Sequence, residues 1–326
     1  MGTHDVQKVD GPGVVTGRSG TLGKVNFVPE GFWPLNTSLW VKDFHGNEPR
    51  WVARLLANMH LERFSRGSGV PTLNRNLVHV VKVNVPPLDE QRRIAAILDK
   101  ADAIRRKRRE AIALTEELLR STFLEMFGDP VTNPKGFPRR SIGSFCKTGS
   151  GGTPSRKKLA RYYGGSIPWV KSGELREEVV LSTGESITDA ALAESSVKWI
   201  PAKALLVAMY GATVGRVAML GIPATSNQAV CHIVPDASVA LPEFMFEALQ
   251  AQVPHWLEQR VGGAQPNISQ SIVKETQMPV PSLDEQDRFA RTAERIKRSK
   301  AACVVAADEA DNLFHSLVQR AFRGEL

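Results

Sequence analysis

The chain has 326 residues, of which 42% are hydrophobic and 23% charged, values typical of a folded globular protein. Its length suggests about two domains of roughly 100–200 residues each. No apolar run approaches the roughly 20 residues of a membrane span, and the first residues lack the pattern of a signal peptide. We therefore expect a soluble, cytoplasmic protein with no membrane association.

The net charge indicates the kind of partner to expect, and the cysteines indicate whether disulfides or metal sites are expected. Lys and Arg number 42 against 34 Asp and Glu, a net charge of +8, which favours a polyanionic partner such as nucleic acid. The cysteines, Cys146, Cys231 and Cys303, are far apart, and none has a partner at metal-ligand spacing. We expect no disulfide framework, no metal site and no cofactor.

The first part of the chain combines short strands with one long helix. Strand-type runs occur at 14–16 and 37–41, and a helical pattern follows near 51–64. The segment Leu88–Phe127 contains no Gly or Pro and carries apolar residues spaced by three, four or seven positions. This pattern predicts a helix of about 60 Å, which ends at Gly128-Asp129-Pro130.

The second part repeats this plan at greater length. Between Phe137 and Pro279, strand-type runs at 205–209 and 229–234 and helical patterns near 243–250 and 254–259 predict a mixed α+β globule. Another helix free of Gly and Pro covers Leu283–Phe322, and Ser282 and Glu285 have the spacing of a capping box at its start.

Three sequence matches identify an internal duplication. VPPLDEQ at 85–91 returns as VPSLDEQ at 280–286, GSGVPTL at 67–73 aligns with GGAQPNI at 262–268, and TLGKV at 21–25 aligns with TVGRV at 213–217. Their common order and nearly constant offset indicate a tandem repeat. The second unit begins near Phe137, and the equivalent start of the first would fall about 55 residues before Met1. We therefore expect the first unit to lack its front part.

No motif predicts catalysis. GRSGTLGKV at 17–25 superficially resembles a phosphate-binding loop, but its glycine spacing differs and Val25 replaces the hydroxyl residue that holds magnesium. We interpret it as a tight turn present in both repeats. Dinucleotide-binding, nucleophile-elbow and zinc-protease motifs are absent from the sequence, and the seven histidines are scattered. We expect a non-catalytic protein.

A basic segment in the second unit suggests binding instead. KTGSGGTPSRKK at 147–158 is a flexible, hydroxyl-rich sequence in which Gly lets backbone N–H groups approach phosphate and Arg or Lys reaches guanine. A basic surface loop without a ligand explains its composition equally well. The duplication favours the first interpretation, because repeated globules on rigid spacers suit two separated segments of one duplex.

The repeated segments resemble a known family. PPLDEQRRIAAILD at 86–99, followed by a basic helix ending in FLEMFGDP at 123–130, resembles the conserved helix of type I restriction–modification specificity subunits. The second copy, ending in FRGEL at 322–326, fits the two-helix plan of this family. GGTP at 151–154, IPWVK at 167–171, YGATVG at 210–215 and SNQ at 226–228 resemble its target-recognition domain.

The resemblance implies two target-recognition domains separated by two long helices that form an antiparallel coiled coil. Each domain would bind one half of a split sequence in double-stranded DNA. The chain would supply no catalytic residue and would dock methyltransferase (modification) subunits, which methylate adenine, and a restriction (translocase and nuclease) subunit that uses ATP. The implied division is a partial first recognition domain at 1–84, spacer helices at 85–130 and 281–326, and a complete second recognition domain at 137–280.

The resemblance also provides the candidate DNA contacts. Most lie in loops of the second globule and two in the matching turn of the first unit. They are Lys147, Arg156, Lys157, Lys158, Lys171, Tyr210, Thr213, Arg216, Arg18 and Lys24.

The shortened first unit leaves alternatives open. Trp40 and Trp51 would lack the early strands as packing partners, which predicts exposed apolar surface, instability or association. The chain is then an inactive remnant, or reads one half-site and self-associates through its helices, or receives an upstream segment supplied separately. A helical assembly module without base readout is the alternative function.

Overall fold

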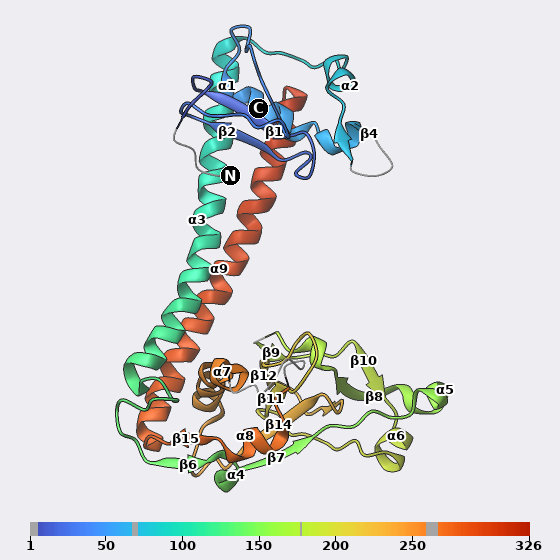
Figure 1. Ribbon diagram of the computed structural model, residues 1–326, viewed down its shortest axis with the longest axis vertical. Coiled ribbons are helices and arrows are strands. Elements are labelled where there is room, and N and C mark those ends of the chain that lie inside the picture. The colour runs from blue at the N-terminus through green and yellow to red at the C-terminus, as the bar shows by residue number, and fades with distance from the viewer. Residues whose placement is uncertain (1–5, 67–70, 177, 259–266) are drawn as a thin grey trace. The chain divides into compact units, whose positions relative to one another are not determined.

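The computed structural model describes residues 6–66, 71–176, 178–258 and 267–326, and the chain divides into two compact units (Figure 1). Unit 1 comprises Met1–Ala113 and Ala301–Leu326, and unit 2 comprises Leu114–Lys300. Each unit contains part of both long helices, α3 (Leu88–Phe127) and α9 (Leu283–Arg323). Within the described ranges, no helix is long and apolar enough to cross a membrane.

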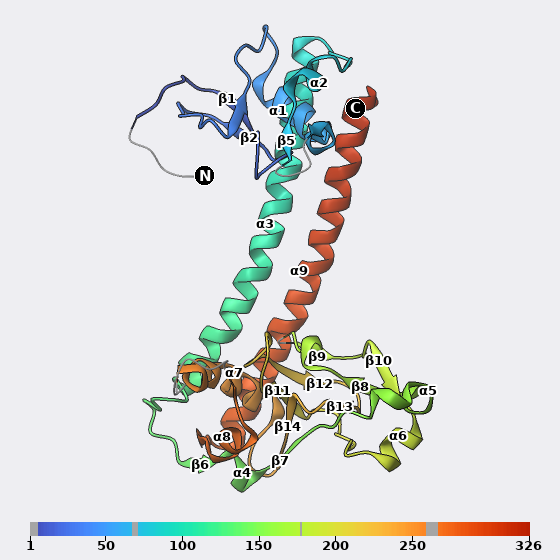
Figure 2. The same ribbon diagram turned by 45° about the vertical axis from the view of Figure 1, so that its right-hand side comes forward.

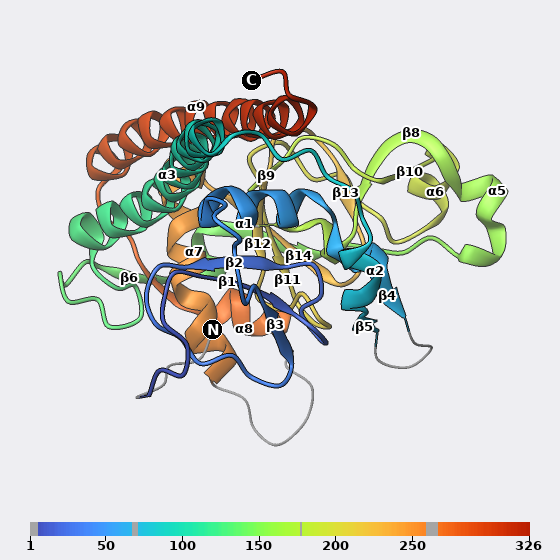
Figure 3. The same ribbon diagram turned by 90° about the horizontal axis from the view of Figure 1, so that it is seen from above.

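Unit 1 is built on a three-stranded antiparallel sheet of order β2-β1-β3. Helix α1 packs on β1 and β2 (Figure 3), and it begins with Glu48 accepting a hydrogen bond from the backbone N–H of Arg50 and with Pro49 in its first turn. The elements before α3 are β1 (Gly13–Gly17), β2 (Val25–Val28), β3 (Ser38–Trp40), α1 (Pro49–Asn58), the 3₁₀ helix η1 (Leu61–Phe64), β4 (Ser65–Arg66), β5 (Thr72–Leu73) and α2 (Arg75–His79). The helix predicted over 51–64 is therefore two elements, α1 and η1.

The core of unit 1 corrects one expectation. Trp51 is 2% exposed because it packs against Ile94 and Leu98 of α3 and Ala321 of α9. The long helices therefore supply the packing surface that we expected Trp51 to lack. Trp40 is half-buried, and its ring lies 5.9 Å from that of Phe32 in an edge-on arrangement.

Unit 2 is a larger α+β globule with a five-stranded sheet of order β7-β14-β11-β12-β9 and a three-stranded sheet of order β10-β8-β13. Its strands are β6 (Arg139–Ser141), β7 (Cys146–Ser150), β8 (Tyr163–Val170), β9 (Val179–Val180), β10 (Glu185–Ile187), β11 (Leu205–Ala208), β12 (Val217–Leu220), β13 (Thr225–Ser226), β14 (Val230–Pro235) and β15 (Gln277–Pro279). Its shorter helices are α4 (Ile142–Phe145), η2 (Arg156–Lys158), α5 (Leu159–Tyr162), η3 (Ser172–Glu174), α6 (Asp189–Glu194), α7 (Pro242–Glu258) and α8 (Gln270–Glu275).

In unit 2, aromatic packing joins helix α7 to the two long helices. Phe123 and Phe127 of α3 meet Phe244 of α7 and Phe289 of α9, with ring centroids 4.9–5.8 Å apart. The two helices predicted at 243–250 and 254–259 form the single helix α7, which contains Pro254. Trp256, after Pro254, is 3% exposed and packs in the same core, which fixes the last turn of α7.

The two long helices are antiparallel in each unit (Figures 1 and 2). In unit 1, Arg109 of α3 pairs with Asp311 of α9 at 2.6 Å. In unit 2, Glu116 of α3 pairs with Lys300 of α9 at 2.8 Å. The start of α9 carries the predicted capping box, since the Ser282 N–H donates to the Glu285 carboxylate at 3.0 Å and the Glu285 N–H donates to Ser282 Oγ at 3.4 Å.

The backbone pairing confirms the predicted duplication. The order β2-β1-β3 of unit 1 matches β12-β11-β14 of unit 2 in sequence position and in antiparallel pairing. The bridge between Val9 and Phe32 likewise matches the bridge between Ile200 and Ala224. Among the described residues, unit 1 has no counterpart of β7 beside β3 or of β9 beside β2.

A buried glutamine anchors each long helix to its globule. Gln286, fully buried, accepts a hydrogen bond from the Leu241 N–H at 2.8 Å, immediately before α7, and donates to Pro281 O at 2.9 Å. Gln91, 2% exposed, accepts from the Glu48 N–H at 2.9 Å, immediately before α1. The last residue of the repeated LDEQ sequence therefore fixes the start of each long helix against the shorter helix of its own unit.

Candidate nucleic-acid interface

Most of the loops that the sequence analysis identified lie where β7, β11 and β14 end or begin, on one side of the five-stranded sheet in unit 2. Ala208, at the end of β11, pairs with Val230, at the start of β14, and Ser150, at the end of β7, pairs with Cys231. Antiparallel pairing therefore brings residues 150–153, 209–216 and 226–229 to the same edge. We call these three segments the loop edge.

The turn between β11 and β12 presents three of the candidate contacts. It is closed by the Gly215 N–H, which donates to Ala208 O at 2.9 Å, and it carries Tyr210, Thr213 and Arg216. Gly215 has a φ of +84°, and a Cβ there would lie 2.6 Å from Val253 Cγ1, so this position requires glycine. The Tyr210 residue is 38% exposed.

Two further candidates share one carboxylate. The Glu185 carboxylate accepts hydrogen bonds from Arg156 at 2.8 Å and from Lys171 at 2.6 Å. The hydrogen bond from Lys171 is the main reason that the pKa of Glu185 is lowered. The Arg156 guanidinium also lies 4.2 Å from the centroid of the Tyr163 ring. The Glu174 carboxylate also lies here, where it accepts a hydrogen bond from the Lys171 N–H at 2.8 Å, so the two cations face two carboxylates beside the end of β8.

The neighbouring lysines differ in their surroundings. Lys158 Nζ donates to Tyr162 Oη at 3.3 Å and lies 5.4 Å from the centroid of that ring. Lys157, in the 3₁₀ helix η2, is exposed and has no ion pair or side-chain hydrogen bond to any residue that the structure describes. Lys157 is therefore free to pair with an external anion.

The glycines of the basic segment do not have the role that we predicted. Residues 146–150 form strand β7, and the Gly151 and Gly152 N–H groups donate to Val230 O at 3.1 Å and Ser226 O at 2.9 Å. A Cβ on Gly151 would lie 2.2 Å from Ser226 O. These glycines allow close packing of two loops, and their amides are not available to phosphate. The prediction of a flexible segment is wrong for residues 147–152.

Lys147 lies away from the candidates of the loop edge. It pairs with Val234 at the far end of β7, three residues before Ser150. At about 3.3 Å per residue, this places its backbone roughly 10 Å along the strand from the loop edge. The exposed carboxylate of Asp236, whose pKa is lowered mainly by hydrogen bonds from Ser238, follows the partner strand there.

The two candidates of unit 1 lie in the equivalent turn. The Leu73 N–H donates to Arg18 O at 2.8 Å, just as the Ile268 N–H donates to Met209 O at 2.7 Å in unit 2. Gly23, with a φ of +76°, immediately precedes the exposed Lys24. This supports the tight-turn interpretation of residues 17–25. Arg18 also lines a cavity of about 430 Å³ in unit 1, together with Arg66 and Arg75.

Two residues of the loop edge were not among the predicted contacts. Gln228 is exposed and its side-chain oxygen accepts a hydrogen bond from Thr153 Oγ1. Asn227 Oδ1 is buried and has no hydrogen-bond partner among the residues that the structure describes. The sequence SNQ at 226–228 contained the signal, but its importance depends on a position beside the turn at 209–216 that only the pairing of β11 with β14 reveals.

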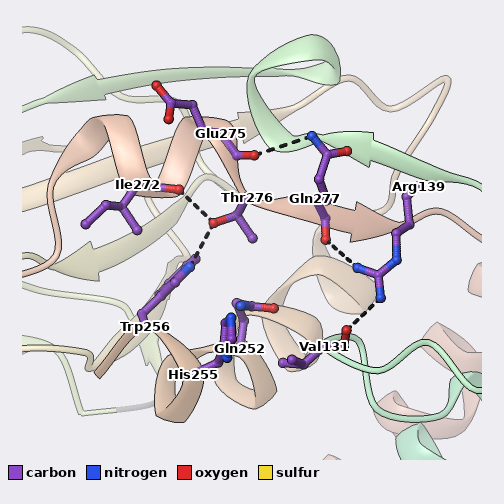
Figure 4. A pocket seen from close by; sticks show the side chains of 9 residues that line it. All are labelled: Val131, Arg139, Gln252, His255, Trp256, Ile272, Glu275, Thr276 and Gln277. Atoms are coloured by element: carbon purple, nitrogen blue, oxygen red, sulfur yellow. Dashed lines mark hydrogen bonds between the residues drawn. The ribbon is translucent and has the colours of Figure 1, made fainter. Parts of the chain in front are cut away.

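A pocket of about 330 Å³ elsewhere in unit 2 is structural (Figure 4). The Trp256 indole donates to Thr276 Oγ1 at 2.8 Å, and the Arg139 guanidinium donates to Val131 O at 2.6 Å and to Gln277 O at 3.1 Å. Most of its polar groups therefore bond to one another. Among the described residues, no group of three or more His, Cys, Asp or Glu side chains is placed to hold a metal ion.

The sequence matches the family described as the type I restriction modification DNA specificity domain over residues 2–114 and 134–301. The chain belongs to this family. The EcoR124I/EcoR124II specificity subunit of Escherichia coli is 27% identical over 213 residues, which is 63% of this chain and 51% of that protein. The MjaIX specificity subunit of Methanocaldococcus jannaschii is 32% identical over 162 residues, which is 48% of this chain and 37% of that protein. The chain thus spans about half or less of the length of these curated relatives.

Solved structures share the fold. A chain from a structure of type I restriction–modification complex assembly has a TM-score of 0.64 at 19% identity, covering 98% of this chain and 83% of that one. The specificity subunit from M. genitalium has a TM-score of 0.61 at 13% identity, covering 98% of this chain and 85% of that one. These likenesses bear out the predicted class of α+β domains joined by two long antiparallel helices.

Proposed function

We propose that this chain is the non-catalytic DNA-recognition subunit of a type I restriction–modification complex and that its loop edge reads one half of a bipartite site. The main observation that supports this proposal is that Tyr210, Thr213 and Arg216 lie together on one turn of the loop edge. Arg and Tyr on an exposed turn suit base-edge and phosphate contacts in a DNA groove. Residues 137–280 are the complete recognition domain in this proposal, and 1–84 are the partial one.

The basic side chains fall into two groups: one is free of internal partners, and the other is held by a carboxylate. Lys157 lacks a partner among the described residues, which suits a phosphate contact that fixes position without reading sequence. Arg156 and Lys171 are oriented by Glu185, which suits contacts that require a fixed geometry. Lys158, Arg18 and Lys24 are further phosphate contacts in this proposal, and Lys147 contributes least because it lies at the far end of β7.

The partner subunits dock, in this proposal, along the long helices at 85–130 and 281–326. In unit 2, Leu114 and Leu118 of α3 are 56% and 51% exposed, and in unit 1, Val305 of α9 is 58% exposed. Leu114 and Leu118 lie one helical turn apart, so they form a continuous apolar patch, and such a patch suits a protein–protein contact. Methyltransferase subunits that methylate adenine and an ATP-dependent restriction subunit are the partners that we infer.

Duplex binding measured over a salt series tests the proposal. Lys157→Ala is expected to weaken binding to all sequences alike and to reduce the slope of log K against log salt by about one. Arg216→Ala is expected to cost about 1–3 kcal/mol and to relax sequence preference at one position. Lys147→Ala removes the same charge as Lys157→Ala at the far end of β7 and is the matched control.

The alternative, an assembly module without base readout, rests on the same exposed apolar residues of the helices. It predicts binding that is weak and indifferent to sequence, with Arg216→Ala no different from Lys147→Ala. Sequence-specific binding that Arg216→Ala alone relaxes would exclude this alternative.

A further inference from the structure

The Arg156 side chain of unit 2 is held on two sides. Its guanidinium lies 4.2 Å from the centroid of the Tyr163 ring and donates through Nη2 to the Glu185 carboxylate at 2.8 Å. The ring is itself fixed, because Tyr163 Oη donates to Pro154 O at 2.7 Å. A guanidinium that is both stacked and paired has a defined plane and a defined direction.

Part of this guanidinium remains available to a ligand. The Arg156 side chain is 51% exposed, and the bond to Glu185 uses one N–H of Nη2. The two N–H groups of Nη2 belong to different edges of the planar fork. Whichever of them is bound, the other edge keeps two parallel donors, from Nη1 and Nη2 or from Nε and Nη2. Such a pair matches two neighbouring acceptors that lie in one plane.

The charges around Arg156 favour a base over a phosphate. Glu185 also accepts a hydrogen bond from Lys171 Nζ at 2.6 Å, and Glu174 accepts one from the Lys171 N–H at 2.8 Å. The cluster therefore contains as many carboxylates as cations. A phosphate needs a surplus of positive charge and would be repelled by the carboxylates, whereas the edge of a base is uncharged.

The cluster adjoins the loop edge. Strand β8 ends at Val170, whose carbonyl accepts from the Asn227 N–H at 2.9 Å. In the same strand, Trp169 Nε1 donates to Gly152 O at 3.0 Å, and the Arg156 guanidinium lies 5.5 Å from the centroid of the Trp169 ring. Asn227 and Gly152 both belong to the loop edge, so Arg156 lies beside it.

We propose that Arg156 reads a guanine in the major groove, with its free pair of donors on O6 and N7, and that Glu185 and Tyr163 are the positioning residues for this contact. Arg on O6 and N7 is the commonest specific contact in that groove. Lys157, the next residue, is exposed and has no ion pair to any described residue, so it is the phosphate contact of the same segment. This inference rests on the proposed function, because it assigns a base to one side chain of the DNA interface.

Duplexes that contain 7-deazaguanine test this contact, because the modified base pairs normally but lacks the N7 acceptor. The full chain first selects its preferred sequence from a random pool of duplexes, and each guanine of that sequence is then replaced in turn. At one guanine, the replacement is expected to weaken binding at least roughly fivefold. At that position Arg156→Ala should show an effect below about twofold, because it has already lost the donors. Lys157→Ala, one residue away, is the matched control and should keep the whole effect.

Glu185→Gln separates positioning from charge. An amide has a single acceptor oxygen, so it cannot hold both Arg156 and Lys171, and the loss of a negative charge favours DNA of any sequence. We therefore expect this variant to bind unrelated duplexes more tightly while its guanine effect falls at least about twofold. Thermal melts confirm that the variant is folded. Tighter binding to all duplexes with an unchanged guanine effect would show that Glu185 acts through its charge alone and does not position Arg156.

The results that contradict this inference differ from those that contradict the proposed function. A preferred sequence without guanine, or a guanine effect that Arg156→Ala leaves intact, would overturn the role of Arg156 and leave the proposed function standing. Arg156→Ala that weakens binding to all sequences alike, as expected of Lys157→Ala, would identify a phosphate contact and would also overturn it. Selection of no sequence by the unaltered chain would contradict the proposed function, and this inference with it.

Discussion

Replacing Gln286 by Met should destabilise unit 2 although the side-chain volume barely changes. Gln286 is fully buried and makes three hydrogen bonds, accepting from the Leu241 N–H at 2.8 Å and donating to Pro281 O at 2.9 Å and Val239 O at 3.1 Å. Met fills the space but satisfies none of these groups. Each buried polar group left without a partner costs on the order of 1 kcal/mol or more.

The expected loss in the free energy of unfolding is therefore about 3 kcal/mol, or roughly 6–12 °C in the melting temperature of a unit of this size. Urea unfolding followed by tryptophan fluorescence measures the loss, and hydrogen exchange at the start of α7 locates it. Arg288→Met, on an exposed position of the same turn of α9, is the matched control and should change stability by less than about 0.5 kcal/mol. A Gln286→Met protein as stable as this control would refute the role assigned to the glutamine.

Three further outcomes follow from burial and helix geometry. Burial raises the pKa of the Cys146 and Cys231 thiols to about 12. At pH 8, a thiol reagent should therefore label only Cys303 in the native protein and all three cysteines after unfolding. Rapid labelling of all three in the native protein would contradict this. Burial also raises the pKa of Glu247, so its protonated form is favoured in the folded state and stability falls as pH rises above the unfolded value. Glu247→Gln should then stabilise the protein at pH 7 and not at pH 4, as thermal melts at the two pH values would show. Ile104→Pro should abolish co-purification with a methyltransferase subunit by breaking α3, whereas Ile104→Ala, at a position 42% exposed, should retain it.

Local signals in the sequence were sufficient to predict where the long helices begin and end. α3 spans the predicted Leu88–Phe127, and α9 ends one residue after the predicted Phe322, because both lack Gly and Pro and are bounded by clear capping and terminating residues. The strands β11 and β14 also lie within a residue of the predicted runs at 205–209 and 229–234. Periodicity and turn residues are properties of neighbouring positions, so they can be read from the sequence.

Features that depend on tertiary pairing were not predictable. Gly151 looked like a phosphate-binding glycine, but its role depends on the Ser226 carbonyl, 75 residues later, which lies 2.2 Å from where its Cβ would be. Trp51 looked unpartnered because Ala321 is distant in sequence. The repeated Gln was visible as a motif, yet its hydrogen bond to the residue before α7 requires knowledge of which helices meet. These roles depend on contacts between residues far apart in the sequence, and the periodicity of neighbouring residues does not predict such contacts.

Genome-wide mapping of adenine methylation tests the central claim most directly. The chain would be expressed with a methyltransferase subunit of a type I system in a host that lacks other such systems, alongside a variant carrying Tyr210→Ala and Arg216→Ala. The proposed function predicts a bipartite methylated motif for the unaltered chain and loss of sequence preference in one half of that motif for the variant. A soluble complex that methylates no specific sequence, or a motif that the variant leaves unchanged, would contradict recognition by the loop edge.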